Sequence, residues 1–141
     1  HWRGLLREPL RLLLPEGHPL TADTAPIPLT RLGGERLITM RRTSQLWVVT
    51  DSLLSRHGIE PTAGLVADDL PTLYGYVAAG LGVALAPGRL RAGVRLQRLA
   101  EDDAFREIGL SWAPAAVGHP VEGSHPGTGE VAAPTTPPGR E

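Results

Sequence analysis

The polar residues with the clearest chemical potential in this chain form one short run, Arg41-Arg42-Thr43-Ser44. It stands between an apolar segment, residues 37–40, that predicts a strand and an amphipathic segment, residues 46–57, that predicts a helix. In an open α/β sheet, ligands bind beyond the carboxyl ends of the strands, where helix N-termini converge. The run therefore stands at a place where an α/β protein can hold a ligand.

Several groups of this run would suit a carboxylate or another small anion. The free backbone N–H groups, the positive end of the helix dipole and the Ser44 hydroxyl all favour negative charge. Arg41 or Arg42 could add charge-assisted hydrogen bonds. The alternative is that Thr43 or Ser44 only caps the helix and that both Arg side chains are solvated. Taken alone, the residues favour this alternative.

Residues of catalytic and metal-binding types form no recognisable active site. The chain has no Cys, which excludes disulfides, thiol catalysis and Cys-ligated metal centres. Its five His residues are scattered, and no two of them lie at a metal-ligand spacing within a helix. The nucleophile-elbow, phosphate-loop and dinucleotide-binding motifs are missing. We therefore expect no enzymatic activity, no metal and no cofactor.

Two further polar or glycine-containing motifs have simple structural explanations. Asp68-Asp69 suits the start of a helix, and Pro71 fits its first turn. Gly80-Leu81-Gly82 suits a tight reversal from this helix into the next strand. A close approach of the glycine backbone to a ligand is the less favoured additional role.

Composition narrows the class of protein further. The 141 residues carry 14 basic and 15 acidic side chains, for a formal charge of -1, which argues against a nucleic-acid surface in this segment. The apolar runs are too short to cross a membrane, and the charged residues among the first twenty are unlike a signal peptide. The chain opens at His1 and its single Met is Met40, so we expect an incomplete translation product.

The chain divides near Trp112. Residues 113–141 contain six Pro and five Gly and few large apolar side chains, which predicts a disordered tail. Residues 1–112 predict strands and helices in the order β, β, α, β, α, β, β, β. Strands separated by helices of this length favour a mostly parallel sheet with flanking helices. The predicted elements cover residues 10–14, 37–40, 46–57, 62–66, 68–80, 82–86, 94–99 and 108–112.

Five ordered segments resemble the effector-binding domain of LysR-type transcriptional regulators, over about residues 5–112. Each segment is unspecific alone, but the ordered set is fairly specific. They are LRLLLPEGHPL at 10–20, GERLI at 34–38 with RTS at 42–44, GIEP at 58–61, LYGYVAAGLGVALAP at 73–87 and IGLSW at 108–112.

The resemblance implies an α/β fold like that of periplasmic type 2 solute-binding proteins, with a small metabolite bound between two lobes. Residues 27–90 would form the second lobe, and the flanking segments would belong to an incomplete first lobe. The ligand-facing Ser or Thr of the family falls on Ser44, with Arg42 and Thr43 beside it. The resemblance also makes Asp68 and Gly80 expected effector-binding positions.

The chain also departs from the family pattern. No winged helix-turn-helix precedes the matching segments, so DNA binding is expected only through a missing N-terminal part. Family membership further implies a homo-oligomer in the cytoplasm, with no membrane partner. Two alternatives remain at this point: a periplasmic-type solute-binding protein, and an enzyme on a related lobe such as a biosynthetic dehydratase, for which no catalytic residues are found.

Overall fold

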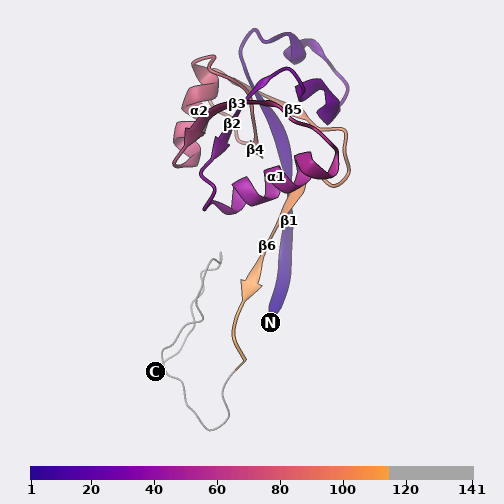
Figure 1. The fold of residues 1–141 in the computed structure, drawn as a ribbon, viewed down its shortest axis with the longest axis vertical. Helices are drawn as coiled ribbons and strands as arrows, with labels where there is room; N and C mark the ends of the chain where they lie inside the picture. Colours follow the sequence, from indigo (N-terminus) through magenta and orange to yellow (C-terminus); the bar gives the residue numbers. More distant parts are fainter. Residues whose placement is uncertain (115–141) are drawn as a thin grey trace. The chain divides into compact units, whose positions relative to one another are not determined.

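The computed structural model describes residues 1–114. All eight predicted strands and helices are present in the predicted order, and two short 3-10 helices lie between the first two strands (Figure 1). The predicted tail lies outside the described residues from residue 115 onward. The elements are β1 (Trp2–Pro15), η1 (Pro19–Ala22), η2 (Leu29–Leu32), β2 (Arg36–Met40), α1 (Gln45–Arg56), β3 (Thr62–Ala67), α2 (Leu70–Ala78), β4 (Ala84–Pro87), β5 (Val94–Arg98) and β6 (Phe105–Ser111).

Strand β1 lies between β4 and β5 and is antiparallel to both. The register runs from Leu10 opposite Pro87 on one side and from Arg11 opposite Arg98 on the other. The expectation of a mostly parallel sheet is therefore wrong around β1. Helix crossovers determine strand direction only within β-α-β units, and β1 precedes every helix crossover, so its direction could not be inferred in that way.

Strands β2, β3 and β4 form the part of the fold that follows the parallel prediction. β2 and β3 are parallel, with Met40 opposite Ala67. Leu37 forms a parallel bridge to Val83, the residue just before β4. The two connections in this β-α-β-α-β unit are α1 and α2, which lie beside β2 and β3 in Figure 1.

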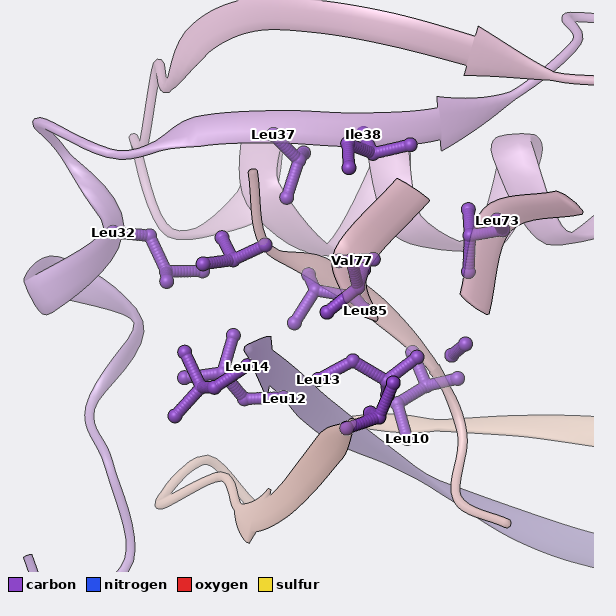
Figure 2. Packing of buried hydrophobic residues seen from close by; sticks show 14 of the residues in the cluster. Leu10, Leu12, Leu13, Leu14, Leu32, Leu37, Ile38, Leu73, Val77 and Leu85 are labelled. Atoms are coloured by element: carbon purple, nitrogen blue, oxygen red, sulfur yellow. The ribbon is translucent and has the colours of Figure 1, made fainter. Parts of the chain in front are cut away.

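Leucines of β1 occupy the centre of the hydrophobic core. Leu12, Leu13 and Leu14 are fully shielded from solvent, and Figure 2 shows them close to Val77 of α2 and Leu85 of β4. A strand with neighbours on both edges and cover on both faces requires such a continuous apolar run. The rest of β1 was not expected from the sequence, because residues 2–8 lack this continuous apolar run. In the structure these residues are largely exposed.

The described chain divides into two compact units. The larger comprises Pro9–Arg106. In the smaller, β6 pairs with the first part of β1. There the His1 ammonium donates to the Trp112 carbonyl at 2.9 Å, and the Trp112 N–H donates to the His1 carbonyl at 3.0 Å.

Within residues 1–114, no helix has the length and apolar character needed to cross a membrane.

The ends of the two α-helices lie within one or two residues of their predicted positions. Ser44 caps α1, and its hydroxyl accepts the Leu46 N–H at 3.1 Å. Asp69 caps α2, and its carboxylate accepts the Thr72 N–H at 2.8 Å. Gly80 has a φ of 80° just beyond α2, as expected of a left-handed helix stop.

Truncating the centre of β1 tests the role of this strand in the core. We expect Leu13→Ala to lower the free energy of unfolding by about 2–5 kcal/mol, because it leaves a cavity in a site with no access to solvent. Leu90→Ala is the matched control, since Leu90 is 89% exposed, and it should change the free energy by less than about 0.5 kcal/mol. Urea denaturation measures both, and equal effects would contradict the assigned core.

The cap of α2 predicts a specific pH dependence. Hydrogen bonds from Thr72 lower the pKa of Asp69 below its ordinary value of 3.8. Because the folded-state pKa is depressed, this stabilisation is complete above pH 3.8 and is lost as the pH falls through the folded-state value. Asp69→Asn should therefore show a shallower loss of stability than the wild type below pH 4, roughly the ordinary Asp pKa. Asp102→Asn, in an exposed turn, is the control, and identical acid profiles for wild type and Asp69→Asn would exclude this cap effect.

Candidate functional site

The carboxyl ends of β2 and β3 bring two polar turns together. Because Met40 is opposite Ala67 in a parallel register, the residues that follow each strand lie side by side. The Arg41 Nε lies 3.5 Å from the Asp68 Oδ1 and joins the two turns. Helices α1 and α2 both begin here, one residue after Ser44 and Asp69 respectively. The convergence of helix N-termini expected for a ligand site is therefore present.

Ser44 places hydrogen-bond donors at this edge of the sheet. Its backbone N–H donates to the Arg41 carbonyl at 2.8 Å, which closes the turn before α1. The Ser44 oxygen already accepts from Leu46, but a hydroxyl also carries a proton that it can donate. The N–H groups of Gln45 and Trp47 lie in the first turn of α1, where a helix supplies no internal acceptor. Capping is thus confirmed, and it leaves several donors for an anion.

Arg42 has a defined neighbour that the sequence analysis did not identify. Its guanidinium carbon lies 5.2 Å from the centre of the Trp47 ring, within the range of a cation–π contact. Both side chains line a cavity of about 510 Å³ between α1 and β3, together with Asp51 and Glu60. The sequence signal that could have indicated this contact is Trp47, an aromatic residue three positions after the Ser44 cap. Arg42 is thus held against α1, while Thr43 is exposed in the turn.

Gly80 lies at the opposite edge of the sheet from Ser44 and Asp68. It borders a cavity of about 240 Å³ with His18, Glu35 and Arg36, and Arg36 is the first residue of β2. Ser44 follows the other end of the same strand. The structure therefore brings Ser44 and Asp68 to one edge and does not bring Gly80 there.

The charges at the Ser44 edge are mutually balanced and accessible to solvent. The Arg41 and Asp68 side chains are 60% and 78% exposed, and such a pair contributes little to stability. Exchanging Asp68 for a bound anion as the partner of Arg41 would therefore cost little. Asp69 is committed to capping α2, and its lowered pKa keeps it ionised.

The chemistry available at this edge is reversible binding. Hydrogen-bond donors and an exposed guanidinium are present, but the described turns show no paired nucleophile and base. Among residues 1–114, no group of three or more metal-ligating side chains is close enough to hold an ion.

Comparison with known proteins identifies the family. The family model of the LysR substrate binding domain matches residues 1–121. YybE, an uncharacterized HTH-type transcriptional regulator of Bacillus subtilis (strain 168), is 31% identical over 114 residues, which are 79% of this chain and 39% of YybE. CatR, an HTH-type transcriptional regulator of Pseudomonas putida, is 31% identical over 93 residues, 64% of this chain and 32% of CatR. The chain therefore spans less than half of the curated relatives it matches.

Solved structures show the same fold. The BenM effector binding domain with its effector benzoate has a TM-score of 0.70 at 23% identity, covering 77% of this chain and 52% of that one. The reduced form of OxyR has a TM-score of 0.66 at 27% identity, covering 83% of this chain and 56% of that one. The predicted fold class is confirmed, and the relatives are transcriptional regulators, not enzymes, as the sequence predicted. The chain belongs to the LysR substrate-binding-domain family, the effector-binding part of LysR-type transcriptional regulators.

Proposed function

We propose that this chain senses a small anionic metabolite for a LysR-type regulator and binds it at the N-terminus of α1. The observation that carries the proposal is the meeting of two capped helix N-termini at one sheet edge, joined by the exposed Arg41–Asp68 pair. Helix N-termini favour anions through their free N–H groups and their dipole. Two structural neighbours contain benzoate and shikimate, both of which carry a carboxylate.

Each residue of the turn has a distinct role in this proposal. The Ser44 hydroxyl and the N–H groups of Gln45 and Trp47 donate to the ligand carboxylate. Arg41 leaves Asp68 and pairs with the ligand. The freed Asp68 carboxylate then accepts from hydroxyl or amine groups elsewhere on the ligand, which would give selectivity for polar metabolites.

Thr43 and Arg42 define the margins of the proposed site. The exposed Thr43 hydroxyl can contact the ligand from the turn. Arg42 reaches the ligand only by leaving Trp47, so we assign it a lesser contribution. We do not include Gly80, because it lies at the amino end of β2.

We extend the proposal to a full-length regulator that would contain this chain. We infer that the predicted second lobe, residues 27–90, supplies one wall of the effector cleft and that a first lobe supplies the other. The full protein would be a cytoplasmic homo-oligomer that binds DNA through an N-terminal winged helix-turn-helix. The transcriptional regulators among the relatives favour this function over a periplasmic-type solute-binding protein.

Two substitutions at Ser44 separate ligand binding from helix capping. Asp caps a helix about as well as Ser does, so Ser44→Asp should keep the free energy of unfolding within about 0.5 kcal/mol. Its added charge should repel a carboxylate and weaken binding about tenfold or more, since a charge-assisted hydrogen bond is worth about 1.5–3 kcal/mol. Ser44→Ala should lose about 1 kcal/mol of stability and also bind less tightly.

Ligand-observed NMR with a panel of small carboxylates, including benzoate and shikimate, measures the affinities. Ser55→Asp is the control, because it adds the same charge near the other end of α1. A panel member that binds wild type and Ser44→Asp equally well would refute the site, and so would a panel in which benzamide binds as well as benzoate.

A further inference from the structure

The C-terminal end of α1 contacts a carboxylate from a turn that is distant in the sequence. We call this contact of Asp103 with Arg56 and His57 the clasp. The His57 Nε2 lies 2.9 and 3.1 Å from the two oxygens of Asp103, and the Arg56 Nε donates to the same carboxylate at 3.1 Å. Asp103 belongs to the turn between β5 and β6. A second arm of Arg56 donates to the Ser52 hydroxyl at 2.8 Å, which orients the guanidinium along the helix.

The electrostatics of this clasp suit the end of a helix. Cationic side chains are favoured at a helix C-terminus because the last carbonyl groups carry partial negative charge. The His57 ring, followed by Arg56, lowers the pKa of Asp103 below its ordinary value against an opposing contribution from burial. The carboxylate therefore stays ionised at neutral pH.

The turn that carries Asp103 is itself held to the rest of the larger unit. Glu101 accepts the Leu29 N–H at 2.9 Å through its Oε2. On the other side of Asp103, the Ala104 carbonyl accepts the Leu10 N–H at 3.0 Å. A movement of the turn would therefore displace the hydrogen-bond acceptor of Leu10 in β1.

The contact between Ala104 and Leu10 lies next to both points where the chain crosses between its two units. The chain enters the larger unit at Pro9 and leaves it after Arg106. Leu10 is one residue from the first crossing, and Ala104 is two residues from the second. The backbone bond between them ties the two crossings together.

We propose that Asp103 is a positioning residue that couples the Ser44 turn to these two crossings through α1. The inference rests on the proposed function for its biological meaning. The 12 residues of α1 span about 18 Å as a stiff rod, with Ser44 at one end and the clasp at the other. A ligand that shifts the first turn of α1 moves the clasp, the turn 101–104 and the crossings with it.

A double-mutant cycle tests the coupling without a ligand. Ser44→Ala perturbs one end of α1 and Asp103→Asn opens the clasp at the other. In the wild-type background, Ser44→Ala should speed amide exchange at Leu10 and Phe105 by about threefold, through local opening. In the Asp103→Asn background, the same substitution should change these rates little. Distant sites without a shared partner behave additively, so non-additivity demonstrates coupling.

Three controls separate coupling from a general loss of stability. The Leu13 amide, in the buried centre of β1, reports global unfolding and should follow the overall stability alone. Asp102→Asn removes a neighbouring exposed carboxylate and should leave the Ser44 effect intact. Asp103→Glu keeps the carboxylate and should restore the coupling. Additive exchange effects at Leu10 and Phe105 would overturn the proposal.

The cycle also distinguishes the two proposals from each other. Non-additive exchange supports the coupling even if no carboxylate of the panel binds, in which case only the proposed function fails. Additive exchange overturns the coupling even if a carboxylate binds at Ser44 and the proposed function stands.

Discussion

Burial of the β1 leucines is the constraint from which the rest of the larger unit follows. Leu12, Leu13 and Leu14 are completely shielded from solvent. Such burial requires β4 on one edge of β1, β5 on the other and apolar cover on both faces. The position of β4 then determines that of β2, because the Ile38 N–H donates to the Val83 carbonyl at 2.8 Å. The edge that carries the candidate site is thus positioned by packing some distance away from it.

Polar interactions then define what that edge can do. β2 and β3 end together, so the turns after them share the Arg41–Asp68 pair, and the caps of α1 and α2 orient free N–H groups toward the same region. An exposed ion pair is a weak interaction, which makes it suitable for exchange with a ligand. At the opposite end of α1, two donors share the Asp103 carboxylate. The helix therefore links the turn that carries Ser44 to the turn that carries Asp103.

Local sequence signals predicted the order of the elements and the helix ends, because the information lies within a few residues. Ser44 as a cap and Gly80 as a left-handed stop are such cases. Non-local pairing could not be predicted in the same way: the antiparallel neighbours of β1 come from residues 84–98. Gly80 follows the C-terminal end of α2, whereas Asp68 precedes its N-terminal end. The direction of the chain through α2 therefore places Gly80 at the sheet edge opposite the Ser44 site. The contacts of Arg42 with Trp47 and of His57 with Asp103 depend on side-chain rotamers and on long-range packing.

In the proposed function, a small anion binds where α1 and α2 begin. The most direct test of this binding is a titration of the ¹⁵N-labelled chain with benzoate, shikimate and other small carboxylates, followed residue by residue through the amide resonances. We expect a binding carboxylate to shift the amides of Gln45 and Trp47 first and most, with a smaller response at Asp68. Shifts concentrated around Gly80 and Arg36, with Gln45 and Trp47 unchanged, would contradict it.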